Sequence, residues 1–265
     1  MPYRVDIPHA PAHALDRLID LGALDVDIIE GTAAAILPDT APLADVLARL
    51  DLSVDDVRVS AARARDDGSI WTLGPRPVRV GRWQIVPAHA RPGTDVLRLI
   101  DGPAFGTGLH ATTALCLETL DDELSAWPPV RVLDVGTGSG ILALAALRAG
   151  VPHATAIDID ADALQVTREN AVLNDVDARL HLVRGEPSSL DGQWPLVLAN
   201  VLAAPLVAMA PALAACVARR GRLVLSGIRT SLAADVLQAY RHVGAHLVNE
   251  RTRDGWTALT LRTPG

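Results

Sequence analysis

The spacing of apolar residues divides the chain into two parts with different patterns. Over residues 1–60, strand-like runs are interrupted by two segments with apolar residues every three or four positions, which predicts the order β-α-β-β-α-β. That order is typical of a small ferredoxin-like α+β domain. We expect strands at 4–7, 24–30, 33–37 and 54–60, and helices at 12–21 and 42–50.

From about residue 96 onward, apolar strand-like runs alternate with longer helical segments. This alternation predicts an α/β domain with a mostly parallel, Rossmann-like sheet and helices on both faces. The chain ends on a predicted antiparallel hairpin around Asp254-Gly255. We expect strands at 130–135, 154–159, 180–183, 196–201, 222–228, 246–251 and 256–261, and helices at 114–120, 140–149, 161–173, 203–218 and 231–243.

Residues 61–95 are rich in proline, glycine and arginine and interrupt both patterns. Such a stretch is typical of a joint between domains, and we expect only a short strand pair within it, at 78–80 and 83–86. The chain is therefore divided into a small domain at 1–60, a linker at 61–95 and a large domain at 96–265.

The amino-acid composition excludes several kinds of functional site. All 24 basic residues are arginine, which excludes a phosphate-binding loop with its lysine and a lysine Schiff base. Cys116 and Cys216 lie in helical patterns with no C-x-x-C spacing, so we expect buried free thiols in a reducing cytoplasm. The first residues lack the basic-then-apolar order of a signal peptide.

An uncharged stretch at 197–218 resembles a membrane helix in composition. It contains Asn200, Pro205 and Pro211, however, and is mostly alanine. We therefore predict a buried strand followed by a buried helix, and no association with a membrane.

Charge is spread unevenly along the chain. Residues 1–60 hold 11 acidic residues and four arginines, a net −7, whereas the other 205 residues hold 20 of each sign. An acidic small domain beside a neutral large one suggests a basic partner for the small one. A surface that is acidic only for solubility explains the charge equally well.

A glycine-rich turn at 134–140 follows a predicted buried strand and precedes a helix. Glycines let the backbone approach a ligand, and a helix start is electropositive. A dinucleotide fingerprint needs glycine at position 141, where this chain has Ile141. The turn formed by Gly136, Gly138 and Gly140 therefore favours S-adenosylmethionine over NAD.

Polar residues stand at the ends of the next strands. Asp158 is placed to accept both ribose hydroxyls, while Asp160 is expected to cap the following helix. Glu186 is equally an adenine ligand or a solvated loop residue. Asn200 has two possible roles. It either caps the next helix or accepts an N–H from an amine substrate, which would turn the nitrogen lone pair toward the methyl group of S-adenosylmethionine.

The segment 104–113, Ala-Phe-Gly-Thr-Gly-Leu-His-Ala-Thr-Thr, is the most distinctive of the chain. It precedes a helix whose N-terminal amides favour the carboxylate of the cofactor. Thr112 and Thr113 would add hydroxyl groups. For His110 a structural role is the default expectation.

Together these motifs resemble a known family, the bacterial ribosomal protein methyltransferases called PrmA. The resemblance is carried by Phe105-Gly106-Thr107-Gly108-x-His110-x-Thr112-Thr113, Asp134-x-Gly136-x-Gly138-Ser139-Gly140, Ile157-Asp158-Ile159-Asp160, Ala199-Asn200-Val201-Leu202 and Ser226-Gly227-Ile228. It implies a class I methyltransferase fold, to which the terminal hairpin also fits, with the small domain recognising the substrate.

The resemblance also implies the activity and its residues. The expected activity is transfer of methyl groups from S-adenosylmethionine to amines, at lysine side chains or the N-terminus, of a large-subunit ribosomal protein. Another protein, a small molecule, or a vestigial fold that binds the ribosome remain alternatives. Neither a metal nor direct nucleic-acid binding is expected. Asn200 is expected to be catalytic, and the cofactor contacts are expected at Phe105, Gly106, Thr107, Thr112, Gly136, Gly138, Gly140, Asp158 and Asn200.

Overall fold

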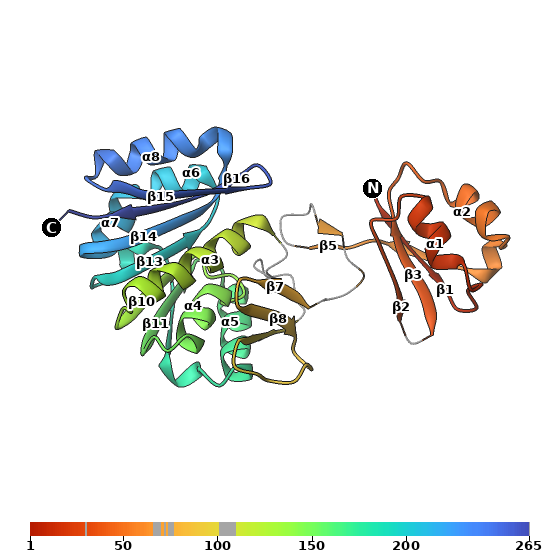
Figure 1. The fold of residues 1–265 in the computed structure, drawn as a ribbon, viewed down its shortest axis with the longest axis horizontal. Helices are drawn as coiled ribbons and strands as arrows, with labels where there is room; N and C mark the ends of the chain where they lie inside the picture. Colours follow the sequence, from red (N-terminus) through yellow and green to blue (C-terminus); the bar gives the residue numbers. More distant parts are fainter. Residues whose placement is uncertain (30, 66–69, 72, 74–76, 101–109, 265) are drawn as a thin grey trace. The chain divides into compact units, whose positions relative to one another are not determined.

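The computed structural model describes residues 1–29, 31–65, 70–71, 73, 77–100 and 110–264 (Figure 1). The chain forms two compact units, Met1–Pro75 and Arg76–Gly265. In the described part of the chain, no helix combines the length and the apolar character needed to cross a membrane.

Unit 1 is a four-stranded antiparallel sheet in the order β2-β3-β1-β4, with two helices. This confirms the predicted ferredoxin-like arrangement. The predicted strand at 54–60 is wrong in its first half, because Ser53 and Asp56 cap each other around a short 3₁₀ turn. The elements are β1 (Tyr3–Ile7), α1 (Ala14–Asp20), β2 (Asp25–Ile29), β3 (Thr32–Leu37), α2 (Leu43–Leu50), η1 (Val54–Asp56), β4 (Arg58–Ala61) and the short pair β5 (Ala64–Arg65) and β6 (Ile70–Trp71).

The two faces of this small sheet differ in chemistry. Val5 and Ile7 of β1 pack with the helices in an apolar core. Arg4 and Asp6, which alternate with them, therefore lie on the opposite face, and the pairing register puts Asp25 of β2 on that same face. Apolar alternation and the pairing register together thus decide which carboxylates of the sheet share a surface.

Unit 2 is built on a seven-stranded sheet in the order β12-β11-β10-β13-β14-β16-β15. Its first five strands are parallel, and β16 runs antiparallel to both of its neighbours. This confirms the mostly parallel sheet with a terminal antiparallel hairpin. The strands are β10 (Arg131–Val135), β11 (His153–Asp158), β12 (Leu180–Arg184), β13 (Trp194–Asn200), β14 (Val217–Arg229), β15 (His246–Arg253) and β16 (Trp256–Arg262).

Helices cover both faces of the large sheet, as the alternating pattern predicts (Figure 1). Two separate apolar clusters fill the spaces between sheet and helices. On one face lie α3 (Ala111–Ala126), α4 (Ile141–Arg148) and α5 (Ala161–Leu173), and on the other α6 (Ala203–Ala208), α7 (Ala210–Cys216) and α8 (Ala233–His242). Short 3₁₀ turns η2 (Asp177–Arg179), η3 (Pro187–Ser189) and η4 (Thr230–Leu232) lie between them.

Three predicted elements of unit 2 are corrected by the structure. The helix expected at 203–218 is two helices joined at Met209, because Pro211 occupies the first turn of the second and has no N–H to continue the first. The strand expected at 222–228 begins earlier, at Val217. The helix expected at 114–120 is longer at both ends and spans Ala111–Ala126.

Part of the proline- and arginine-rich stretch joins unit 2. A three-stranded sheet is formed by β7 (Val78–Val80), β8 (Trp83–Pro87) and β9 (Val96–Leu99). Trp83 is fully buried, and its Nε1 donates to Asp121 Oδ1 of α3 at 3.0 Å. This packing fixes the path by which the chain reaches the segment before α3.

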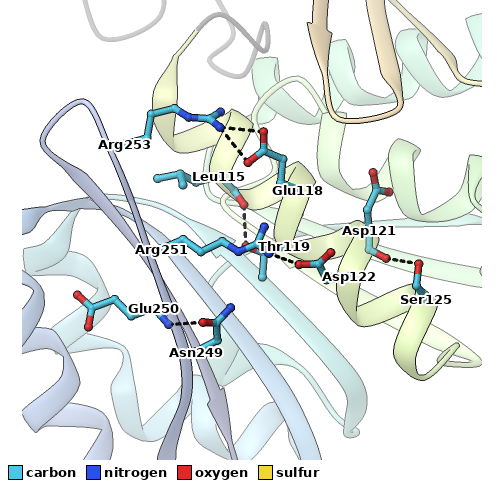
Figure 2. Close-up of polar contacts among 10 residues, drawn as sticks. All are labelled: Leu115, Glu118, Thr119, Asp121, Asp122, Ser125, Asn249, Glu250, Arg251 and Arg253. Atoms are coloured by element: carbon cyan, nitrogen blue, oxygen red, sulfur yellow. Dashed lines mark hydrogen bonds and ion pairs between the residues drawn. The ribbon is translucent and has the colours of Figure 1, made fainter.

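Ion pairs hold α3 against the terminal hairpin (Figure 2). Arg253 of β15 contacts both carboxylate oxygens of Glu118, at 3.0 and 3.1 Å, and Arg251 pairs with Asp122 one turn further along α3. Each such surface pair contributes little alone, but both fix the same helix. They keep the start of α3 at the edge where the strands of the sheet end.

Candidate active site

Four strands of unit 2 bring polar side chains to one edge of the sheet. Asp134 lies near the end of β10, Asp158 ends β11 and Asn200 ends β13. Asn200 is paired in register with Ser226 of β14. Because the carboxyl ends of parallel strands meet at one edge, these groups converge where ligands of such sheets bind.

The glycine turn after β10 requires its glycines. Gly136, Gly138 and Gly140 have φ of +67°, +56° and +84°, in the left-handed region. A Cβ on Gly136 would lie 2.4 Å from a Val201 methyl, and one on Gly140 would lie 2.7 Å from Thr167 Cγ2. The turn is therefore closely packed between β13 and α5, and its last glycine begins α4.

Asp134 is buried below this turn. Its Oδ2 accepts hydrogen bonds from Thr137 Oγ1 at 2.7 Å and from the Ala143 N–H at 3.2 Å. Its Oδ1 is buried and has no hydrogen-bond partner among the described residues. Burial raises the pKa of Asp134 to about 6, and the nearby Asp158 adds to that rise. A cation placed at this edge would favour the ionised form.

Asp158 and Asp160 make different contacts. Asp160 caps α5 by accepting the Asp162 N–H at 2.9 Å, which confirms that expectation. Asp158 accepts the N–H groups of Gly138 at 3.1 Å and Asp160 at 3.0 Å, one on each carboxylate oxygen. Since each oxygen can accept a second bond, Asp158 retains the capacity for two ligand hydroxyls.

The structure removes one of the two roles considered for Asn200. The residue that precedes α6 in the capping position is Leu202, so Asn200 does not cap that helix. Asn200 Nδ2 donates a long hydrogen bond of 3.4 Å to Thr113 Oγ1. Its Oδ1 is buried without a partner in the described part of the chain. Buried polar atoms are normally hydrogen-bonded, so this amide oxygen is available to accept a bond from a ligand.

The start of α3 closes this edge of the sheet. His110 caps the helix, and its Nδ1 lies 2.8 Å from Thr112 Oγ1 and 3.3 Å from the Thr112 N–H, which confirms its structural role. Ser226 Oγ donates to the Thr112 carbonyl at 3.1 Å. The Trp256 ring meets the His110 ring edge-on at 4.8 Å and carries the Arg229 guanidinium at 3.9 Å.

Sequence reasoning did not single out Ser226 or Trp256. Ser226 belongs to the Ser226-Gly227-Ile228 motif, which carries the family resemblance but indicates no role for its hydroxyl. Trp256 follows the predicted Asp254-Gly255 turn as an isolated aromatic residue. The predicted cofactor residues Phe105, Gly106 and Thr107 lie outside the described residues.

Three other candidate groups show no arrangement for catalysis with the residues that the structure describes. Glu186 is exposed on a loop and caps nothing with its side chain. Cys116 and Cys216 are buried free thiols, as predicted, and burial, with the nearby Asp134, raises the pKa of Cys116 to about 12. Among the described residues no cluster of three or more His, Cys, Asp or Glu side chains is arranged to hold a metal.

The strand order, the glycine turn and the acids at the ends of β10 and β11 define a class I methyltransferase, a fold whose enzymes use S-adenosylmethionine as the methyl donor. A family model described as "Ribosomal protein L11 methyltransferase (PrmA)" matches residues 26–264. The chain belongs to that family.

Relatives agree with this assignment. The chain is 41% identical over 276 residues to the ribosomal protein L11 methyltransferase of Azotobacter vinelandii, with 92% of each chain covered. It is 48% identical over 201 residues to that of Chromohalobacter salexigens, covering 75% of this chain and 65% of that protein, which is less than two thirds of it. A solved ribosomal protein L11 methylase from Lactobacillus delbrueckii subsp. bulgaricus matches at TM-score 0.64 and 30% identity, covering 70% of this chain and 96% of that chain.

Proposed function

We propose that this chain transfers methyl groups from S-adenosylmethionine to amines of ribosomal protein L11 in the cytoplasm. The proposal is carried by the buried Asn200 Oδ1, an acceptor without a donor at the edge where the glycine turn, Asp134 and Asp158 meet. The names of the relatives supply the substrate. The amines are those of lysine side chains, of the N-terminus, or of both.

The residues at this edge suit S-adenosylmethionine. The left-handed glycines at 136, 138 and 140 let the ligand approach the backbone, and Asp158 has the free acceptor capacity for ribose hydroxyls. The carboxylate of the donor would lie at the start of α3, near Thr112, where backbone N–H groups favour an anion. Its cationic groups match the unpartnered Asp134 Oδ1. Residues 105–107 belong to this proposal through the family motif alone.

Methyl transfer needs little from the protein beyond placement. The bound donor supplies a methyl group already activated by its sulfonium, and the enzyme holds a neutral amine in line with it. A free lysine amine has a pKa of about 10.4 and is mostly protonated at neutral pH. Asn200 Oδ1 would accept one N–H of the neutral amine and so direct the nitrogen lone pair at the methyl carbon.

We further propose that residues 1–60 select the protein substrate, because they carry a net charge of −7. Asp16 and Asp20 are exposed on α1. Asp25 lies on the opposite face of the small sheet, is buried and accepts the Leu73 N–H at 2.7 Å. Asp25 therefore serves the fold of unit 1, whereas the exposed acids on α1 are available to a basic partner.

Labelled methyl transfer tests the proposal directly. Purified protein is incubated with methyl-labelled S-adenosylmethionine and unmethylated ribosomal proteins, and the product is identified by mass spectrometry. We expect label on amines of L11. Label on another protein, or only on a small molecule, would leave the methyltransferase class intact and overturn the substrate.

A further inference from the structure

Helix α5, together with Asn174 that directly follows its last turn, presents three polar side chains on one face, each about one turn from the next. Thr167, Asn170 and Asn174 are all buried, and their spacing puts them on one stripe of the helix. None of them belongs to the motifs that carry the family resemblance. Buried polar groups have to be hydrogen-bonded, and apart from a bond from Asn174 back to the Asn170 carbonyl, the partners described below lie in other segments.

Two of the three side chains hold the glycine turn. Thr167 Oγ1 donates to the Gly138 carbonyl at 2.9 Å, and Asn170 Nδ2 donates to the Ser139 carbonyl, also at 2.9 Å. Both carbonyls are thereby turned toward α5. The methyl group of Thr167 also fills the space that a Cβ on Gly140 would need.

The same helix face holds the end of β9. Asn170 Oδ1 accepts the Ile100 N–H at 2.8 Å, and Asn174 Oδ1 accepts the Arg98 N–H at 2.9 Å. Asn174 Nδ2 returns a bond to the Arg98 carbonyl at 2.7 Å. The single amide of Asn170 therefore connects the end of β9 to the glycine turn, two segments that are distant in sequence.

A turn with three left-handed glycines needs such support. Glycine loses more conformational freedom on ordering than any other residue, so an unsupported turn would pay that entropy when it bound a ligand. Groups that hold a binding loop in its bound shape before the ligand arrives raise affinity by removing this cost. Here the support comes from side chains that lie beneath the turn and belong to a separate helix.

We infer that Thr167 and Asn170 are positioning residues for cofactor binding, which preorganise the glycine turn through the carbonyls of Gly138 and Ser139. The inference rests on the proposed placement of S-adenosylmethionine at this turn. Neither residue needs to touch the donor. Their loss should raise the KM for S-adenosylmethionine, leave kcat at saturating donor unchanged, and leave the KM for the protein substrate unchanged.

Two conservative variants isolate these bonds. Thr167→Val keeps the shape over Gly140 and removes only the hydroxyl. Asn170→Asp keeps an acceptor for the Ile100 N–H and, when ionised, replaces the donor to the Ser139 carbonyl with an oxygen that can only accept. Calorimetry with S-adenosylhomocysteine, at a temperature where every variant is fully folded, should give an affinity about tenfold weaker for each. Steady-state kinetics should place the whole change in the KM for the donor.

Tyr240→Phe is the matched control. Tyr240 is buried, and its hydroxyl donates to the Leu206 carbonyl at 3.0 Å, between α8 and α6 on the other face of the sheet. The Tyr240→Phe variant loses a buried side-chain hydrogen bond of the same kind, and this residue does not contact the glycine turn. Its thermal stability should fall as in the α5 variants, while its affinity for S-adenosylhomocysteine stays at the wild-type value.

The outcomes separate the inference from the proposed site. If Thr167→Val and Asn170→Asp lose no more affinity than Tyr240→Phe, the inference is overturned. Asp158→Ala reports on the placement of the donor. If it weakens binding while the α5 variants do not, only the inference fails. If Asp158→Ala also binds normally, the donor does not sit at this turn and both fail.

Discussion

The two flanks of the candidate site differ in how their polar atoms are satisfied. On the α5 flank, the carbonyls of Gly138 and Ser139 accept bonds from buried side chains of the same chain. On the β13 flank, taken with the neighbouring β10, Asn200 Oδ1 and Asp134 Oδ1 are buried without partners among the described residues. Satisfied groups build a rigid frame, whereas unsatisfied ones mark where a ligand's donors belong. The contrast predicts which substitutions change chemistry and which change affinity.

The largest effect is expected on the β13 flank, at Asn200. Asn200→Ala removes the acceptor that orients the amine, and misplacement of a reacting group costs about 100-fold in rate. Single-turnover methyl transfer should fall by about that factor, while calorimetry should find S-adenosylhomocysteine binding reduced far less. A single-turnover rate near wild type would remove Asn200 from the chemistry.

Asp134→Asn sharpens the contrast through pH. Burial raises the pKa of Asp134 to about 6, from its ordinary value of 3.8, so the folded state keeps this proton up to about that pH. Wild-type stability therefore falls, relative to the variant, as pH rises from 4 to 6, and the cost is complete above pH 6. Asparagine keeps an acceptor for Thr137 and Ala143, so the variant should be more stable at pH 7 by on the order of 3 kcal/mol.

Urea unfolding of both proteins between pH 4.5 and 7.5 measures this difference. A variant that is less stable than wild type at pH 7 would mean that the Asp134 carboxylate is stabilised in the free protein. In the wild type, S-adenosylmethionine should also bind more tightly at pH 7 than at pH 5, because its cationic groups favour the ionised carboxylate. In the variant, binding should depend less on pH.

Asp158 lies between the two flanks, bonded to the glycine turn and still able to accept. Asp158→Ala should weaken S-adenosylmethionine binding by about 1–3 kcal/mol, or roughly tenfold to a hundredfold, from the loss of a charged acceptor. Calorimetry measures it. Asp160→Ala is the control, since it removes only the cap of α5, and an equal loss in both variants would assign the effect to local structure.

The smallest effect is expected in unit 1, away from both flanks. Reversal of the exposed Asp16 and Asp20 to arginine should raise the KM for the ribosomal protein about severalfold, most at low salt. Cofactor affinity should not change. Asp191→Arg, an exposed loop change in unit 2, is the matched control. If reversal leaves the KM and its salt dependence unaltered, residues 1–60 do not recruit a basic substrate by charge.

Local patterns predicted the fold and part of the site. Apolar periodicity was enough to predict most strands and helices of both units and a mostly parallel large sheet, and the glycine turn and the Asp160 cap are short-range features. The break at Met209 was missed because an alanine-rich run hides the effect of Pro211. Apolar alternation alone did not reveal that Asp16 and Asp25 lie on different faces of unit 1, which depends on the pairing register.

The remaining features depend on contacts that no local pattern records. Asn170 lies 31 residues from Ser139 and 70 from Ile100, and both hydrogen bonds form only after β9, β10 and α5 have packed. The unpartnered Asn200 oxygen is likewise a property of the packed edge. A sequence marks such residues as polar positions in a helix or at a strand end, without saying what they hold.

The two buried cysteines can serve as probes of transient local unfolding in this protein. Both thiols are buried in unit 2, with Cys116 close enough to Asp134 for that carboxylate to influence its pKa, and residues 1–75 contain no cysteine. A thiol-reactive dye can therefore reach them only when unit 2 opens, whatever unit 1 is doing. The rate at which the dye labels the unmodified protein therefore measures how often the surroundings of each thiol open. A ligand that stabilises the closed site should lower the labelling rate of Cys116.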